Sequence, residues 1–246
     1  EGIGEVYAAT FHPSVMTHAI EDVFDRYLKG FDPHHVERFF RAAYSSGFTQ
    51  RPDLSMMGVV SGLEMACWDI IGKAAGKPVY ELIGGKIHDK LRTYTYLYPE
   101  NKDGDYDYDN LELAVECAEK NMEQGFTALK FDPVGPYGNY CGHQLSLEAI
   151  DKAATFCERI RKTVGNKCDL LMGTHGQMTP AGAIRLAKRL EPFDPLWFEE
   201  PVPPGQASAM AEVAKNTSIP VATGERLTTK YEFFDLLKHG AASILQ

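Results

Sequence analysis

From residue 91 onward, short runs of β-branched and aromatic residues alternate with longer amphipathic stretches at helical spacing. This alternation predicts a parallel sheet, because a strand followed by a single helix returns the chain to the edge where the strand began. Six such units in succession favour a TIM-type (β/α) barrel, with a doubly wound open sheet as the alternative. We expect strands over residues 91–98, 128–132, 169–174, 196–200, 219–223 and 242–245, and helices over residues 110–124, 146–164, 180–190, 206–216 and 229–238.

The region before this alternation has a different character. Residues 15–28 and 56–76 place apolar side chains at helical spacing, and a pair of glycines at 84–85 closes the region. We therefore predict a mainly helical domain over residues 1–87. A (β/α) domain over residues 88–246 would hold the first six strands of a barrel. The first residues read like the middle of a domain and the last ones like a strand that stops as it starts, so we expect a chain truncated at both ends.

The net charge and the cysteines restrict the class of partner and the compartment. A formal net charge of −9 argues against a nucleic-acid-binding protein, which would need a basic face. A small anionic ligand would need positive charge or a metal ion concentrated at its site. We find no apolar run long enough to span a bilayer and expect no membrane partner. The five cysteines are odd in number, scattered and without a CxxC pair, which favours a reduced, cytoplasmic compartment.

Carboxylates follow two consecutive strands of the predicted barrel, at the end where barrel enzymes place their chemistry. Glu199 and Glu200 end one strand, and Glu225 follows the next strand. A strand-end carboxylate in a barrel mouth loses water and needs a cation or a hydrogen-bond donor. Two of them on neighbouring strands favour a divalent metal, and oxygen ligands suit Mg²⁺, with Mn²⁺ as the second choice. A structural ion pair of one glutamate with Arg226 or Lys130 is the competing interpretation.

Two other strand ends carry polar side chains. Lys130 and Asp132 are two residues apart on one predicted strand, so their side chains point the same way. A lysine among carboxylates can bind an anion or act as a base, and a plain salt bridge is the alternative. His175 lies in a loop after the following strand, where a histidine can titrate usefully, and a surface loop histidine is the alternative.

Several segments resemble the mandelate racemase branch of the enolase superfamily. Residues 62–86, which include the sequence WDIIGK, are similar to its capping domain, and residues 197–201 and 224–225 are similar to its second and third metal-ligand strands. The resemblance covers nearly the whole chain. It implies a partial, mainly helical N-terminal capping domain and a modified (β/α)₈ barrel. It also implies removal of the proton α to a carboxylate, with Mg²⁺ held by three strand-end acids.

The resemblance implies specific metal ligands. Glu199 and Glu225 match the second and third acids, but Gly173 stands where the family has the first. We prefer Asp132, from the adjacent strand, as the replacement. The other possibilities are that His175 ligates the metal directly or that a water molecule fills the position.

The resemblance also implies catalytic roles. His175 matches a histidine of the galactonate- and mannonate-dehydratase-like groups, which protonates the departing hydroxyl. Lys130 matches the first lysine of the family's KxK motif, and Asp132 replaces the second. The base of these groups is a histidine on the seventh strand, which we expect beyond Gln246.

These matches imply a Mg²⁺-dependent acid-sugar dehydratase of carbohydrate acid catabolism. Lys130 would stabilise the enediolate and His175 would protonate the leaving hydroxyl, giving a 2-keto-3-deoxy sugar acid. The partner would be a small-molecule sugar acid, and we expect a homo-oligomer. A racemase, an epimerase or a lactone cycloisomerase on the same scaffold is one alternative. A non-catalytic sugar-acid-binding paralogue is the other, and the missing carboxylate at Gly173 supports it.

Overall fold

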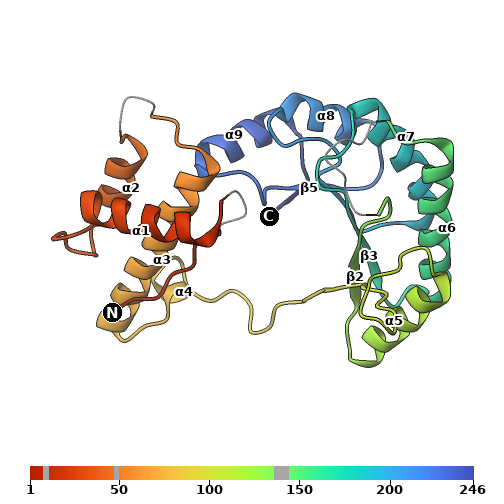
Figure 1. The fold of residues 1–246 in the computed structure, drawn as a ribbon, viewed down its shortest axis with the longest axis horizontal. Helices are drawn as coiled ribbons and strands as arrows, with labels where there is room; N and C mark the ends of the chain where they lie inside the picture. The colour runs from red at the N-terminus through yellow and green to blue at the C-terminus, as the bar shows by residue number, and fades with distance from the viewer. Residues whose placement is uncertain (8–10, 47–49, 136–143) are drawn as a thin grey trace. The chain divides into compact units, whose positions relative to one another are not determined.

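The computed structural model describes residues 1–7, 11–46, 50–135 and 144–246. These residues form two compact units, Glu1–Leu91 and Arg92–Gln246, which we call unit 1 and unit 2. Unit 1 is helical, and unit 2 alternates strands with helices. The helices of unit 1 are α1 (Pro13–Tyr27), α2 (Val36–Tyr44), α3 (Leu54–Ala75) and α4 (Val79–Leu82) (Figure 1).

Helix α3 carries the core of unit 1. The Asp53 side chain accepts a hydrogen bond from the Met56 amide at 2.9 Å and so begins the helix. Gly76 ends it with a φ of +64°, a backbone conformation that glycine adopts without strain. The buried Val59 and Val60 of α3 pack in one cluster with side chains of α1 and α2.

By length and composition, helix α3 is also apolar enough to cross a membrane, and it is the one helix among the described residues that meets this test. The expectation that no such run exists was therefore too strict. The finding is weak evidence for a membrane, because the core helix of a globular domain meets the same test. The packing of α3 against α1 and α2 is that of a core helix.

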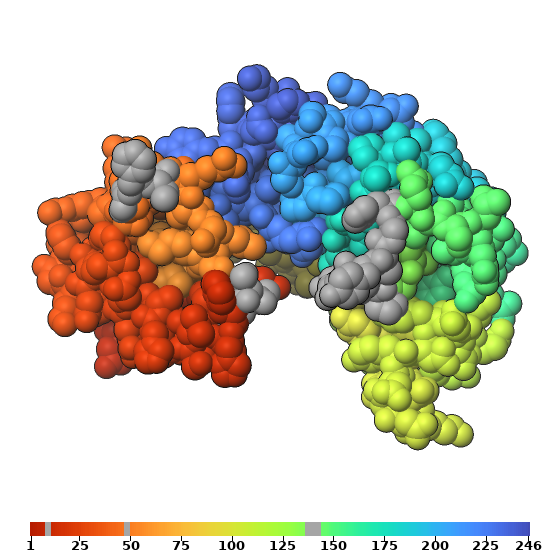
Figure 2. All heavy atoms as spheres, turned by 45° about the horizontal axis from the view of Figure 1, so that its top comes forward, coloured from red at the N-terminus to blue at the C-terminus, as the bar shows by residue number. Residues whose placement is uncertain are grey.

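Unit 2 contains a six-stranded sheet in which all neighbouring strands are parallel and their order follows the chain. The intervening helices lie in an arc outside the strands (Figure 1), and α6, α7 and α8 form a continuous outer surface (Figure 2). A doubly wound sheet would reverse its strand order, so the predicted TIM-type architecture is confirmed. The elements are β1 (Thr95–Tyr96), α5 (Leu111–Glu123), β2 (Ala128–Phe131), α6 (Leu147–Val164), β3 (Asp169–Gly173), α7 (Pro180–Leu190), η1 (Glu191–Phe193), β4 (Trp197–Glu199), α8 (Ala207–Lys215), β5 (Val221–Thr223), α9 (Thr229–His239) and β6 (Ile244–Leu245).

Strand β1 is shorter than predicted at both ends. Leu91 is 78% exposed, so it adds nothing to the sheet. The Arg92 side chain instead forms an ion pair with Asp169 at 2.7 Å and donates to the Thr127 hydroxyl at 2.9 Å. Arg92 therefore contacts residues at the start of β2 and β3, and strand β1 begins three residues further along the chain, at Thr95.

Alternation along the strands separates the core from the interior of the barrel. The core between strands and helices contains Leu129, Phe131, Leu170, Met172 and Phe198. Successive strand residues point to opposite faces, so Lys130, Gly173 and Glu199 face the barrel interior. This arrangement places polar groups inside the barrel at its carboxyl edge.

The cysteines that the structure describes are free thiols, namely Cys67, Cys117, Cys157 and Cys168, whereas Cys141 lies outside the described residues. Cys157 is fully buried, and its Sγ lies 3.8 Å from the Met172 Sδ. Burial raises the pKa of the Cys157 thiol. Cys157 is therefore a packing residue of the core and not a reactive thiolate.

Candidate active site

Polar residues gather at the carboxyl edge of the unit 2 sheet, where active sites of barrel enzymes lie. The strand register pairs Gly173 with Glu199 and Glu199 with Ala222. Asp132 directly follows β2, and the same register places it beside Gly173. Residues at the ends of β2, β3 and β4 therefore lie side by side at one part of the barrel interior.

The first contact at this edge is a buried ion pair between Lys130 and Glu199. Their Nζ and Oε1 atoms are 2.7 Å apart, and the two side chains are 5% and 2% exposed. The other carboxylate oxygen of Glu199 accepts a hydrogen bond from the Trp197 indole at 3.1 Å. The Lys130 ammonium also lies over the rings of Tyr96 and Tyr94, at 5.1 and 5.6 Å from their centroids. The competing interpretation, an ion pair of one glutamate with Lys130, is thus found for Glu199.

The surroundings of Lys130 decide between its two predicted uses. Burial disfavours the charged ammonium, but the hydrogen bond and the negative charge of Glu199 outweigh this effect and raise the pKa of Lys130. A lysine with a raised pKa stays protonated at neutral pH. Lys130 is therefore suited to stabilise negative charge and poorly suited to act as a base.

The second contact joins Asp132, Gly173 and His175. Oδ2 of Asp132 lies 3.7 Å from Nδ1 of His175. Oδ1 of Asp132 is buried and has no hydrogen-bond partner among the described residues. A Cβ placed on Gly173 would lie 2.5 Å from this Oδ1 and 3.5 Å from Cε of Lys130. The Asp132 carboxylate thus occupies the space in which a side chain at position 173 would begin.

Electrostatics at Asp132 fit a site for a cation. Burial raises the pKa of Asp132, and the charges of Glu199 and Glu225 add to this effect, while His175 and Lys130 oppose it. A nearby divalent cation would favour the ionised form of such a carboxylate. The carboxylate oxygens at this edge are also the ligand type that Mg²⁺ and Mn²⁺ prefer.

Glu225 stands apart from this group. It is exposed, in the turn that follows β5, and its charge acts on the pKa values of Asp132 and Glu200. Across the part of the chain that the structure describes, no group of three or more His, Cys, Asp or Glu side chains is arranged closely enough to hold a metal ion. The assignment of Glu199, Glu225 and Asp132 as metal ligands therefore stays a prediction, although the donor type and the partnerless Oδ1 of Asp132 fit a divalent cation.

A second buried ion pair was missed by sequence reasoning, which considered Arg226 only as a partner of the predicted ligands. Arg226 instead pairs with the fully buried Glu200, with its Nε donating to Oε2 at 2.6 Å and a second guanidinium nitrogen contacting the same oxygen. Burial raises the pKa of Glu200 even though Arg226 opposes the shift. The predicted strand over residues 196–200 would place neighbouring side chains on opposite faces, which separates Glu200 from Glu199 but does not identify Arg226 as its partner.

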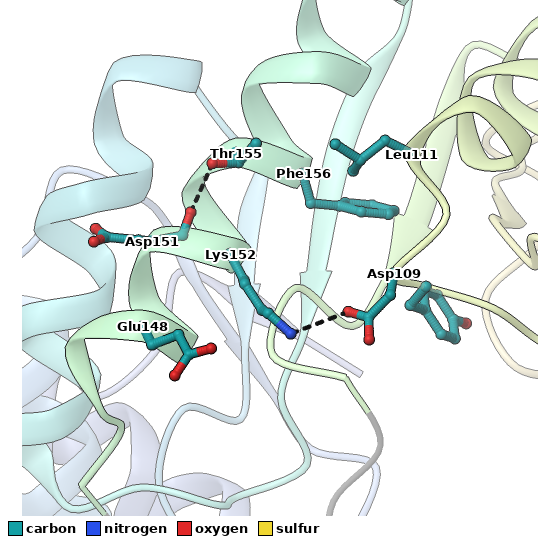
Figure 3. Close-up of a pocket in the computed structure, with 8 residues that line it drawn as sticks. Asp109, Leu111, Glu148, Asp151, Lys152, Thr155 and Phe156 are labelled. Carbon is teal, nitrogen blue, oxygen red and sulfur yellow. Dashed lines mark hydrogen bonds and ion pairs between the residues drawn. The ribbon is translucent and has the colours of Figure 1, made fainter.

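Two adjoining pockets lie beside this edge within unit 2. One, of about 740 Å³, lies over α6, where Phe156 and Leu111 form an apolar wall and Lys152 points toward Asp109 at 3.5 Å (Figure 3). The other, of about 640 Å³, shares Lys152, Asp109 and Phe156 with the first and extends to Asp132. The pocket that extends to Asp132 is therefore lined mainly by acidic and aromatic side chains.

Two known families match this chain. Residues 1–84 match the mandelate racemase/muconate lactonizing enzyme N-terminal domain, and residues 112–246 match the enolase C-terminal domain-like family. A solved Burkholderia SAR-1 protein, assigned to the mandelate racemase/muconate lactonizing enzymes, is 71% identical with a TM-score of 0.96, covering 100% of this chain and 61% of that protein. A solved mandelate racemase/muconate lactonizing enzyme from Jannaschia sp. CCS1 is 55% identical with a TM-score of 0.93, covering 100% and 64%.

Curated relatives match this chain at lower identity. The D-galactonate dehydratase of Ralstonia pickettii is 34% identical over 229 residues, which are 93% of this chain and 56% of that enzyme. This chain therefore spans little more than half the length of that relative. The sequence resemblance is confirmed on both units, and the chain belongs to the mandelate racemase/muconate lactonizing enzyme branch of the enolase superfamily.

Proposed function

We propose that the protein is a Mg²⁺-dependent acid-sugar dehydratase that acts on a small-molecule sugar acid in carbohydrate acid catabolism. Two lines of support come together. Relatives over nearly the whole of this chain are D-galactonate dehydratases. The carboxyl edge of the sheet also brings together a protonated lysine, a histidine and carboxylates, which are the groups that a dehydration needs.

In this proposal Glu199, Glu225 and Asp132 hold the divalent cation. When bound, the cation would supply a charge that stabilises the substrate carboxylate as it becomes more negative. Asp132 takes the place of the family's first acid, because its carboxylate occupies the space left by Gly173. The close approach of the Asp132 carboxylate to position 173 is the observation that supports the proposal, since a carboxylate from the adjacent strand would supply the acid that the sequence lacks there.

In the proposed reaction, Lys130 stabilises the negative charge that develops on the substrate, and His175 donates a proton to the leaving hydroxyl. As the proton α to the substrate carboxylate leaves, negative charge moves onto the carboxylate oxygens, and the Lys130 ammonium stabilises it. His175 then donates a proton to the β-hydroxyl, the Cβ–O bond breaks and water departs. The enol that remains becomes a 2-keto-3-deoxy acid. Nδ1 of His175 faces Asp132, so we assign the proton delivery to Nε2.

The decisive experiment uses the full-length protein that contains this chain. A panel of hexonates and uronates that includes D-galactonate is incubated with and without Mg²⁺, and 2-keto products are measured. We expect a Mg²⁺-dependent 2-keto product from at least one acid. Exchange of the α-proton with D₂O in the absence of any 2-keto product would instead indicate a racemase, an epimerase or a cycloisomerase.

The variant His175→Asn separates the two chemical steps. We expect it to lose product formation while the α-proton still exchanges with D₂O, because the base acts before the hydroxyl leaves. Full product formation in this variant would remove His175 from the mechanism.

A sugar-acid-binding protein without metal chemistry is the second candidate. The ion pair between Lys130 and Glu199 favours it, because Glu199 already has a cationic partner. So does the lack of a three-ligand cluster among the described residues. Calorimetric titration of the full-length protein with Mg²⁺ and Mn²⁺ discriminates between the two candidates. Binding of a sugar acid without any metal binding would establish the second one.

A further inference from the structure

An ion pair between residues adjacent to the predicted ligands joins two of the segments that carry the predicted functional residues. Glu200 directly follows Glu199, and Arg226 directly follows Glu225. Glu200 is 0% exposed and pairs with the guanidinium of Arg226, whose Nε lies 2.6 Å from its Oε2. Thr223, at the end of β5, donates its hydroxyl to the other oxygen of Glu200 at 3.4 Å. One buried ion pair therefore connects the end of β4 to the turn that carries Glu225.

The loop that carries His175 is attached to the same segment. The Thr174 hydroxyl donates to the carbonyl oxygens of Glu199 and Glu200, at 2.8 and 3.0 Å. The amide of Gly176 donates to the carbonyl of Glu200 at 2.6 Å. His175 itself has a φ of +52°, a left-handed conformation that non-glycine residues adopt only when their surroundings hold them there. The hydrogen bonds on both sides of His175 fix this conformation.

The Arg226 guanidinium also packs against this loop. A Cβ placed on Gly176 would lie 2.6 Å from a guanidinium nitrogen and 3.1 Å from Cα of Pro203. The φ of Gly176 is +71°, so both the space and the backbone conformation require glycine there. Nη2 of Arg226, which contacts Oε2 of Glu200, thus also lies against the position of Gly176 beside His175.

We propose that Arg226 is a positioning residue for the reaction: through its ion pair with Glu200 and its contact with Gly176, it fixes the His175 loop and the Glu225 turn relative to Glu199. This inference rests on the proposed function for the roles of those three residues. Arg226 acts through them and does not touch the substrate. A lysine cannot replace it, because a lysine ammonium is a single point of charge and lacks the planar arrangement in which Nε and Nη2 both contact Oε2 of Glu200.

The test compares Arg226→Lys with Arg189→Lys in the full-length protein. Arg189 is the matched control, because it forms a half-exposed ion pair with Asp151 on the outer surface. Three quantities are measured for each variant: the affinity for Mn²⁺ by calorimetry, hydrogen exchange at the Gly176 amide, and kcat and KM for the sugar acid that the wild type dehydrates. Thermal unfolding reports on overall folding.

For Arg226→Lys we expect a folded protein with about tenfold weaker Mn²⁺ binding and faster exchange at Gly176, a tenfold change being about 1.4 kcal/mol. We expect kcat to fall by roughly 100-fold with a smaller change in KM, because a misplaced catalytic group mainly affects the transition state. The control should match the wild type in every measurement. Reversal of the pair, in Arg226→Glu with Glu200→Arg, should not restore function, because the guanidinium would no longer contact Gly176.

Two results would overturn the inference. One is wild-type Mn²⁺ affinity, Gly176 protection and kcat in Arg226→Lys. The other is a uniform loss of protection throughout unit 2 with a lower Tm, which would make Arg226 a general structural residue. The Mn²⁺ and exchange measurements do not need turnover. If the wild type dehydrates no sugar acid, the proposed function fails while these two measurements still decide the role of Arg226.

Discussion

At position 173, a side chain and the Asp132 carboxylate compete for the same space. A Cβ there would come within 2.5 Å of Oδ1 of Asp132, and Gly173 has no left-handed φ that would add backbone strain. The substitution Gly173→Ala should therefore displace the carboxylate with little direct effect on the backbone. We expect Mn²⁺ affinity to fall at least tenfold, which calorimetry on the full-length protein would measure.

The matched control is Gly205→Ala, because a Cβ at Gly205 meets no atom within 4 Å. It should leave Mn²⁺ binding at the wild-type level. A stronger test moves the carboxylate, in the double variant Asp132→Gly with Gly173→Asp, which should bind Mn²⁺ better than Asp132→Gly alone. Equal affinities for these two variants would show that Asp132 does not substitute for a carboxylate at position 173.

Lys130 offers a second test at the residue scale. The substitution Lys130→Met leaves Glu199 buried without its cationic partner, and breaking a buried pair in this way costs about 3–5 kcal/mol. Urea unfolding should show a loss of this size, and Lys130→Met with Glu199→Gln should lose less. The control Lys152→Met removes an exposed ion pair with Asp109 and should cost at most about 1 kcal/mol. A similar loss in both single variants would contradict a special role for the buried pair.

The residues of the candidate site differ in how far the sequence predicts them. The two-residue spacing of Lys130 and Asp132 is enough to place both side chains on one side of a strand, because that period is a property of the backbone. The partner of Glu200 is not predictable in the same way, because Arg226 follows a different strand and the pairing depends on how β4 and β5 lie side by side. The position of the Asp132 carboxylate beside Gly173 likewise depends on how β2 and β3 pair, and this pairing cannot be predicted from a single sequence.

At the scale of the elements, Arg161 contacts two connections at the amino edge of the sheet, one between α6 and β3 and one between η1 and β4. From α6, its guanidinium donates to the carbonyl oxygens of Gly165, Cys168, Phe193 and Asp194, at 2.7 to 3.2 Å. In barrels this edge serves stability, whereas chemistry lies at the other. Arg161→Ala removes the donor from four carbonyls, of which those of Cys168 and Phe193 make part-buried hydrogen bonds, and we expect a loss of about 2–3 kcal/mol in urea unfolding. Catalysis by the full-length protein should be retained under conditions where it is folded.

Arg159→Ala is the control for this prediction, because Arg159 lies on the same helix and forms an exposed ion pair with Glu112. We expect it to change the free energy of unfolding by about 0.5 kcal/mol or less. If Arg161→Ala is no more damaging than Arg159→Ala, the carbonyl contacts do not contribute to stability.

Glu191 makes a pH-dependent connection between η1 and the segment that precedes β5. Its carboxylate accepts hydrogen bonds from the Ser218 amide, the Thr217 hydroxyl and the Lys188 ammonium. The Ser218 amide gives the largest favourable contribution, and together these bonds hold the pKa of Glu191 below its ordinary value of 4.5 despite some burial. The stability that follows from a lowered carboxyl pKa is present above the ordinary pKa and is lost as the pH falls through the lowered one.

The variant Glu191→Gln should therefore lose about 1–2 kcal/mol of stability at pH 7. The difference from wild type should narrow as the pH falls below 4.5, because the wild-type carboxylate then becomes protonated. Thermal unfolding between pH 3 and pH 8 would measure this. The exposed Glu119 on α5 gives the control Glu119→Gln, which should show no such trend. A difference that stays constant with pH would contradict the electrostatic explanation.

The elements also show why helices are easier to predict than strands here. Helices α5, α6 and α7 begin where Asn110, Ser146 and Thr179 accept hydrogen bonds from backbone amides, and such caps are local sequence signals. The ends of β1 depend on a long-range contact instead, because Arg92 holds the preceding segment against residues near β2 and β3. A propensity for extended structure in residues 91–98 does not reveal whether a neighbouring strand is available to pair with them.

At the scale of the whole molecule, charge is distributed to suit a small anionic ligand only with help from a cation. The chain carries a formal net charge of −9, and the pocket that reaches Asp132 is lined by further aspartates. Lys130 and Arg226, which lie on segments that carry the predicted ligands, are both paired with glutamates. A substrate carboxylate would meet a negative field at this edge unless a divalent ion were bound there. The overall charge and the candidate site thus both support the proposed metal dependence.

The proposed metal dependence predicts that metal binding stabilises the folded protein. A ligand present at 100 times its Kd stabilises the state that binds it by about 2.7 kcal/mol. The variant Glu225→Gln is well suited to test this, because Glu225 is exposed and its loss should change stability by only about 0.5 kcal/mol without metal. We expect Mg²⁺ to raise the Tm of the full-length wild type and of the control Glu116→Gln, and to have little effect on Glu225→Gln. An equal rise in all three would show that Mg²⁺ binds elsewhere, and no rise in the wild type would favour the sugar-acid-binding protein. A rise that Glu225→Gln abolishes would instead link the exposed Glu225 to the buried residues of β2 and β4 as parts of one metal site.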